Sequence, residues 1–210
     1  MITIVNNSHN GSNGDEMSHI GRKLYHLCGG VGLLSLYYIL GRNRALAFYG
    51  IFFFAVLGLD IIRLTIPAVN RFIFSRFKSF IRSNEAHKLT GTAPYILGIG
   101  LSLYFFSSEV ATAAICFLAF GDVAATTIGE RYGKTKIGAK SLEGSAAFLV
   151  AALGAGLLIS FLGIQLSLWV LVFGALVAAG VELLPLPVND NLVIPIVSGG
   201  FMELALRIVK

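Results

Sequence analysis

Long apolar runs recur along this chain and constrain its fold more than any other feature. Seven runs approach the roughly 20 residues that a helix needs to cross the hydrocarbon core of a bilayer. They lie at Leu24–Leu40, Ala45–Ile62, Ala93–Phe106, Val110–Ile128, Ala146–Leu162, Leu166–Leu184 and Leu192–Val209. Only 13% of the residues are charged, against about a quarter in soluble domains. The runs are continuously apolar rather than alternating, so we predict an all-α polytopic membrane bundle of about seven transmembrane helices.

The polar N-terminus sets the expected domain boundary. Residues 1–18 are rich in Asn, Ser and Gly, and they lack the basic and apolar regions of a cleaved signal peptide. We expect residues 1–18 to form a flexible tail and residues 19–210 to form a single membrane-embedded domain, because no linker divides them. Cys28 and Cys116 lie inside apolar runs without metal-ligating neighbours, which indicates packing rather than zinc or disulfide chemistry.

Basic residues crowd the loops after the second and fourth apolar runs, which predicts that both loops are cytoplasmic. With seven spans, the N-terminus and the turn Pro185–Asn191 face the same side. Arg42 and Arg44 then lie on the outer side, as an exception to the charge rule. Within the first loop, Arg71–Arg82 carries Phe and Ile on one helical side and cations elsewhere. This pattern predicts an interfacial amphipathic helix, with a gate for lipid substrate as the alternative.

Acidic residues near the membrane are candidates for function, because intramembrane acids are costly. Asp60 precedes Arg63 by three residues, a spacing that favours a structural ion pair. Glu203 lies near the outer end of the last run, where no catalytic role is expected. Asp122 has no cation at helical spacing in its apolar run, and Thr126 shares its helix face. A carboxylate and a hydroxyl so placed suit a Mg²⁺ ion that is held by phosphates.

A polar, glycine-rich loop follows Asp122 and continues to Ser145. It is not a Walker A motif, because three residues rather than four separate Gly129 from Gly133-Lys134 and because no strand precedes it. The glycines would still let backbone amides approach phosphate oxygens, and the lysines would neutralise them. Further amides are expected at the helix that starts near Ser141. An ordinary positive-inside loop explains the lysines, but it does not explain Glu143 or the glycine spacing.

Three other polar segments fall on the same predicted face as this loop. They begin the first span, precede the third and join the sixth to the seventh, and their candidate residues are Arg22, Lys23, His26, Glu85, Lys88, Glu182, Asp190 and Asn191. Each segment alone fits a topology anchor or a turn. Their joint placement on one side is what a site requires.

Together these motifs resemble the CTP-dependent lipid kinases, the family of dolichol kinase, phytol kinase and fungal diacylglycerol kinase, with a more distant likeness to phosphatidate cytidylyltransferases. The likeness runs from Arg22 to about Pro195. It is carried by Arg22-Lys23-x-x-His26, Glu85 before Thr90-Gly91, Gly121-Asp122 with Gly129 and Gly133, Lys140-Ser141-x-Glu143-Gly144, and Glu182 with Asp190-Asn191.

The resemblance implies transfer of the γ-phosphoryl group of CTP to a lipid alcohol, with Mg²⁺, at a cytoplasmic site. It implies that Asp122 holds the metal or acts as base, that Lys140 contacts phosphates, and that Glu143 orients Lys140 or the metal. Asp190 and Asn191 would complete the metal or nucleotide site, and Arg22 and Lys23 would steady the triphosphate. The implied nucleotide-binding set is completed by Gly121, Thr126, Gly129, Gly133, Lys134, Ser141 and Gly144.

The acceptor remains open among polyprenol or dolichol, diacylglycerol and phytol. We expect a lipid alcohol, a nucleoside triphosphate and membrane lipids as partners, with no nucleic acid, and the oligomeric state remains open. The chain is far shorter than dolichol kinase, which favours a compact bacterial or archaeal enzyme in a prokaryotic plasma membrane. A cytidylyltransferase that forms a CDP-lipid is the alternative enzyme. A small transporter is a third interpretation, although the polar residues gather at one face rather than at the midplane.

Overall fold

The computed structural model describes residues 10–76 and 87–208. Within these ranges the chain forms eight helices and one two-stranded hairpin. The elements are α1 (Asn10–Leu40), α2 (Arg42–Thr65), α3 (Pro67–Arg76), α4 (Thr92–Phe105), α5 (Ser108–Tyr132), β1 (Lys136–Ile137), β2 (Lys140–Ser141), α6 (Leu142–Phe161), α7 (Leu168–Leu183) and α8 (Asp190–Ile208).

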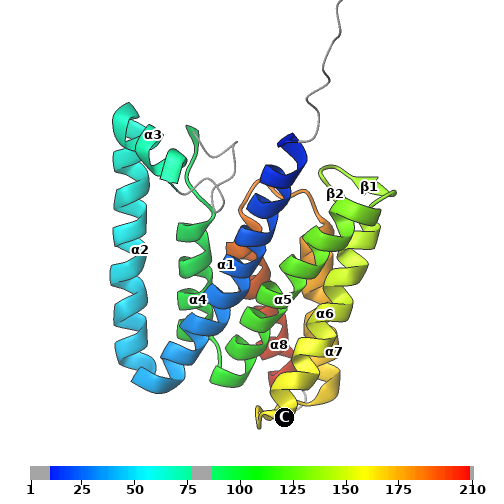
Figure 1. Ribbon diagram of the computed structural model, residues 1–210. Helices are drawn as coiled ribbons and strands as arrows, with labels where there is room; N and C mark the ends of the chain where they lie inside the picture. The colour runs from blue at the N-terminus through cyan, green and yellow to red at the C-terminus, as the bar shows by residue number, and fades with distance from the viewer. Residues whose placement is uncertain (1–9, 77–86, 209–210) are drawn as a thin grey trace, which may run out of the picture.

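The long helices run up and down in sequence, so the predicted all-α membrane bundle is confirmed (Figure 1). Each of the seven apolar runs lies mainly within one long helix. Of these, α2, α5, α6 and α8 are long and apolar enough to cross a membrane, while α4 and α7 are shorter apolar helices. The count of seven spans remains a prediction.

The N-terminal boundary differs from the expected one. Helix α1 begins at Asn10, so residues 10–18 of the predicted tail are helical. The apolar pattern marks only where a helix enters the membrane, whereas each added helical residue needs just one further backbone hydrogen bond once a nucleus exists. Residues 1–9 lie outside the described part of the chain.

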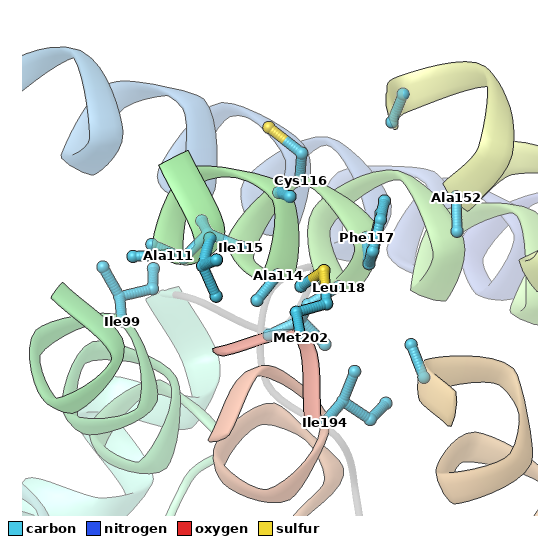
Figure 2. Close-up of a cluster of buried hydrophobic side chains, with 14 of the residues drawn as sticks. Ile99, Ala111, Ala114, Ile115, Cys116, Phe117, Leu118, Ala152, Ile194 and Met202 are labelled. Atoms are coloured by element: carbon cyan, nitrogen blue, oxygen red, sulfur yellow. The ribbon is translucent and has the colours of Figure 1, made fainter. Parts of the chain in front are cut away.

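Helix α5 lies at the centre of the bundle. Every residue from Val110 to Ala119 is buried, and α5 packs against α1, α4, α6, α7 and α8. Figure 2 shows Leu118 of α5 beside Met202 of α8 and Phe117 of α5 toward Ala152 of α6. Small residues in these helices allow close backbone approach, which is how helices pack where the surrounding lipid is as apolar as the side chains.

Helix α2 has a different environment, at the edge of the bundle (Figure 1). Only 17% of its most apolar window is buried. Gly41 alone connects it to α1, with a φ of 76° that favours glycine. The two helices meet at that connection and separate toward the other end of the bundle (Figure 1).

The polar elements gather at the end of the bundle where α1 and α2 are separated (Figure 1). Strands β1 and β2 form a short antiparallel hairpin there, and Gly138 in its turn has a φ of 63°. Two-residue strands carry no periodic pattern, so the sequence did not predict them. Helix α3 lies at the same end and contains the first half of the predicted amphipathic segment. Residues 77–86 lie outside the described ranges, and an interfacial location of α3 remains a prediction.

Candidate functional site

A cavity of about 780 Å³ opens at the polar end of the bundle. Helices α1, α2, α3, α5 and α8, the segment before α4, the hairpin and the α7–α8 loop all contribute to its wall. Its polar side chains are Tyr25, His26, Asp60, Arg63, Thr90, Thr92, Asp122, Lys140, Asn189, Asp190 and Asn191. The remaining wall is largely apolar and is formed by Val56, Leu59, Ile73, Ala139, Pro185, Leu186 and Val188. The cavity therefore has a charged part and an apolar part.

Lys140 and Asp190 form an ion pair on the charged wall. Lys140 Nζ lies 2.8 Å from Asp190 Oδ2, and it also donates to the backbone carbonyl of Glu182 at the end of α7. The side chains of Lys140 and Asp190 are 19% and 34% exposed. A cation is thus held in place, yet remains accessible, at the junction of the hairpin, α7 and α8.

Glu182 forms a second contact near this junction, between α7 and α6. Its carboxylate accepts a hydrogen bond from the hydroxyl of Ser145, and both side chains are buried. Ser145 lies on α6, so the bond fixes α6 against α7 next to the carbonyl that receives Lys140. We predicted Glu182 as a possible site residue from the sequence. The structure places it behind Lys140 rather than on the cavity wall.

Asp122 lies on the wall of the cavity and is half-buried on α5. Thr126, its expected partner at i+4, donates its hydroxyl to the backbone carbonyl of Asp122 at 2.8 Å. That hydroxyl satisfies the carbonyl of its own helix, and Thr126 is not part of the cavity wall. The carboxylate of Asp122 therefore reaches the cavity without the hydroxyl that the sequence placed beside it.

The predicted phosphate-binding glycines lie in the contact between α5 and α6. A Cβ on Gly144 would lie 3.0 Å from the carbonyl oxygen of Ala125, and one on Gly129 would lie 3.1 Å from Ser141 Oγ. A Cβ on Gly121 would lie 2.5 Å from the ring of Phe148. A Cβ would thus clash with Phe148 at Gly121 and would force a neighbour to shift at Gly129 and Gly144, so close helix packing is one reason for glycine at these positions.

Gly133 and Ser141 belong to the same contact. A Cβ on Gly133 would come within 2.9 Å of Ser141 Cβ. Ser141 is the N-cap of α6, and its hydroxyl oxygen accepts the backbone N–H of Gly144 at 3.2 Å. Ser141 thus stabilises the start of α6, which is the ordinary role of a serine at this position.

Glu143 closes the base of the hairpin. Its carboxylate accepts the backbone N–H and the hydroxyl of Thr135, each at 3.1 Å. Lys134 is exposed beside it. Neither Glu143 nor Lys134 lines the cavity.

The first motif contributes to the site in part. His26 and Tyr25 line the cavity, and the carbonyl of His26 accepts the hydroxyl of Tyr95 at 2.6 Å. Lys23 instead forms an ion pair of 3.0 Å with Glu130 near the end of α5, away from the cavity wall. The side chain of Arg22 lies outside the described part of the chain.

Asp60 and Arg63 form the predicted ion pair, with Arg63 Nε 2.7 Å from Asp60 Oδ1. Both side chains are buried, and both border the cavity. Asp60 also accepts the backbone N–H and the hydroxyl of Thr90, both at 2.8 Å. Arg63 donates to the backbone carbonyl of Lys88. The pair thus anchors the segment before α4 to α2.

The segment before α4 is held on its other side by α8. The amide of Asn191 donates to the carbonyl of Gly91 at 3.2 Å, and Asn189 caps the start of α8 through a 3.0 Å bond from the backbone N–H of Asn191. Glu85, which the sequence grouped with this segment, lies outside the described residues. Thr92 and Asn189 are cavity residues that spacing did not reveal, because neither side chain belongs to a charged motif.

The donor set of the cavity fits a phosphate-bound Mg²⁺ ion. In the described ranges no group of three His, Cys, Asp or Glu side chains is arranged to hold a metal. Mg²⁺ in nucleotide sites is usually bound by one or two carboxylates together with phosphate oxygens. Asp122 and Asp190, which both line the cavity, meet that requirement.

Comparison with known proteins gives consistent relatives. The chain is 31% identical to CTP-dependent diacylglycerol kinase 1 of Saccharomyces cerevisiae, over 91% of this chain and 74% of the yeast enzyme. It is 36% identical to the protein of the same name from Eremothecium gossypii, over 64% of this chain and 44% of that protein. It is 28% identical to a probable chloroplastic phytol kinase 3 of Glycine max, over 85% of this chain and 60% of the plant protein. No family model and no solved structure matches.

These relatives are fungal and plant proteins, so the expected prokaryotic plasma membrane is not supported. The match to the yeast enzyme covers 91% of this chain. The structure is an all-α membrane bundle whose cavity has a charged part and an apolar part. Such a structure is consistent with relatives that are named as lipid kinases. The chain belongs to the family of CTP-dependent lipid kinases.

Proposed function

We propose that this protein transfers the γ-phosphoryl group of CTP to the hydroxyl of a lipid alcohol inside the cavity at the polar end of the bundle. The observation that carries this proposal is the division of the cavity wall. Lys140, Asp190 and Asp122 form a charged part that suits a triphosphate. Val56 and Leu59 of α2 and Ile73 of α3 form an apolar part that suits a lipid chain. The relatives support CTP as donor and a lipid alcohol such as diacylglycerol or phytol as acceptor.

The charged wall suits phosphoryl transfer, in which catalysis is mostly positioning and neutralisation of charge. Lys140 is oriented by Asp190 and by the carbonyl of Glu182 before any nucleotide binds. Its ammonium would donate to non-bridging phosphate oxygens, as charge-assisted hydrogen bonds require. When bound, Mg²⁺ would be held by Asp190 together with phosphate oxygens, and it would neutralise charge on the β- and γ-phosphates.

Phosphoryl transfer forms one bond to the γ-phosphorus and breaks another. The acceptor hydroxyl oxygen forms a bond to the γ-phosphorus, the bond from that phosphorus to the β–γ bridging oxygen breaks, and CDP leaves. The hydroxyl proton passes to a carboxylate of the cavity, for which we assign Asp122, and then to solvent. The products are a lipid phosphate and CDP.

We place the cavity on the cytoplasmic side of the membrane. Arg63, Arg71, Arg76 and Lys88 lie in or next to the α2–α4 connection, and Lys134 lies between α5 and the hairpin, all at the cavity end. This distribution follows the positive-inside rule. CTP is a cytoplasmic metabolite, so a cavity that opens to this side has direct access to its donor.

The decisive experiment uses purified protein in liposomes with Mg²⁺, labelled CTP and one lipid alcohol at a time. We expect lipid phosphate and CDP in equal amounts, weaker use of ATP, and no product after chelation of divalent cations. Asp122→Asn should fold but lose almost all activity. Full activity of that variant would contradict the assigned base. Release of pyrophosphate and formation of a CDP-lipid would instead indicate a cytidylyltransferase.

A further inference from the structure

Helix α2 presents a single stripe of side chains to the cavity. Val56, Leu59, Asp60 and Arg63 all line it, and their spacing of three, four and seven residues places them on one side of the helix. The stripe is apolar at Val56 and Leu59 and charged at Asp60 and Arg63. Its polarity therefore changes within two helical turns, or about 10 Å.

The direction of this change matches a lipid in a membrane. Helix α2 runs toward the polar end of the bundle, so Arg63 lies nearer that end than Val56 (Figure 1). In a bilayer the charged part of the stripe would lie at headgroup level and the apolar part at the level of the acyl chains. A lipid alcohol lying along α2 would keep the depth and orientation that it has in its leaflet.

The surroundings of α2 make this wall reachable from the side. Leu59 is 58% exposed although it borders the cavity. Helices α1 and α2 are joined only at Gly41, at the opposite end of the bundle, and they separate toward the cavity (Figure 1). Tyr25 and His26 of α1 line the cavity across from α2.

From these observations, and resting on the function proposed above, we infer that the acceptor lipid enters sideways from the bilayer between α1 and α2. Its acyl or isoprenoid chain lies against Val56 and Leu59, and its hydroxyl reaches Asp122. The nucleotide approaches separately, past the hairpin and the α7–α8 loop. Val56 and Leu59 are thus determinants of acceptor binding that take no part in binding CTP.

Kinetics of a matched pair of variants test this inference. Leu59→Trp fills the proposed path. Ile61→Trp is the control, because Ile61 is 51% exposed and does not line the cavity. With dioleoylglycerol as acceptor, we expect Leu59→Trp to raise the acceptor KM by about fivefold or more, the scale of steric overfilling. The KM for CTP should stay unchanged, and dioctanoylglycerol should be affected less. Ile61→Trp should behave as the unsubstituted protein.

Photocrosslinking gives a second readout that does not depend on a substitution. A diacylglycerol with a diazirine in the middle of its acyl chain, incorporated in liposomes with the unsubstituted protein, should label the α2 peptide that contains Val56 and Leu59. Labelling confined to the hairpin or to the α7–α8 loop would overturn the lateral path, as would equal kinetic effects of the two Trp variants. If the unsubstituted protein phosphorylates no lipid alcohol, the proposed function itself has failed; if it does, only the path is refuted.

Discussion

Lys140 Nζ lies 2.8 Å from Asp190 Oδ2, which joins the β-hairpin to the first turn of α8. Asp190 lies one residue after the N-cap of α8, where a carboxylate is favoured by the helix dipole. The ammonium group is therefore oriented by groups of the protein itself. Preorganised charge of this kind contributes more to catalysis than a flexible lysine does.

Replacement of Lys140 should affect CTP more than the lipid acceptor. We expect Lys140→Met to raise the KM for CTP about 10- to 100-fold, since a hydrogen bond to a charged group contributes about 1.5–3 kcal/mol. Lys134→Met is the control, because Lys134 is exposed and does not line the cavity; its KM should change less than about twofold, as for an ordinary surface charge. Initial rates at varied CTP measure both. Equal losses in the two variants would place the triphosphate on the outer hairpin.

Removal of the buried acid on α2 should destabilise the protein. Asp60→Asn leaves Arg63 without its ionic partner in a buried site, and loss of one partner of a buried pair costs about 3–5 kcal/mol. Glu130→Gln, in the more exposed pair with Lys23, should cost less than about 1 kcal/mol. Thermal unfolding in detergent compares them. Similar melting temperatures would show that Asp60 does not anchor the segment before α4.

Two glycines on α6 provide a matched test of helix packing. Gly144→Ala places a Cβ 3.0 Å from the carbonyl oxygen of Ala125, so α6 must move away from α5 at a cost of about 1–3 kcal/mol. A Cβ on Gly154 meets no atom within 4 Å, and Gly154→Ala should be neutral or stabilising by up to about 1 kcal/mol. Unfolding by heat or denaturant measures the difference. If Gly144→Ala is stable but has lost CTP binding, the glycine serves phosphate contact instead.

Truncation of Glu143 should separate positioning from chemistry. Glu143→Ala removes the acceptor for both bonds from Thr135, so the hairpin loosens and Lys140 loses its fixed position. We expect a rise in the KM for CTP of about 3- to 10-fold, the scale of a lost hydrogen bond, with little change in kcat. Thr135→Val keeps the backbone bond and should have a smaller effect. A collapse of kcat at saturating CTP would mean that Glu143 touches the reacting groups.

Much of the fold was predictable because membrane-spanning helices appear in a sequence as continuous apolar runs. Each of the seven runs lies mainly in one long helix, and the pairing of Asp60 with Arg63 followed from helical spacing. The start of α1 and the short hairpin were not predictable. The start of α1 depends on helix propagation into polar sequence. The strands of the hairpin are too short to show a period.

The site was only partly predictable, for a different reason. Residues that are costly in a membrane could be identified one at a time, and Asp122, Lys140 and Asp190 do border one cavity. Glycine is ambiguous, since the absence of a side chain serves phosphate approach and helix packing equally. Gly129 and Gly144 lie in the contact between α5 and α6, and their part in nucleotide binding stays a prediction. The partner of Lys23 could not be predicted either, because it depends on how α1 lies beside α5.

A rotation of α2 about Gly41 would displace the opposite end of the helix the most. The helix has 24 residues, about 36 Å at the usual rise per residue, with its pivot at the end remote from the cavity. Each degree of rotation about Gly41 would therefore displace the Arg63 end by about 0.6 Å. A turn of ten degrees would displace that end by about 6 Å, and the bonds from Asp60 and Arg63 to the segment before α4 resist such a displacement.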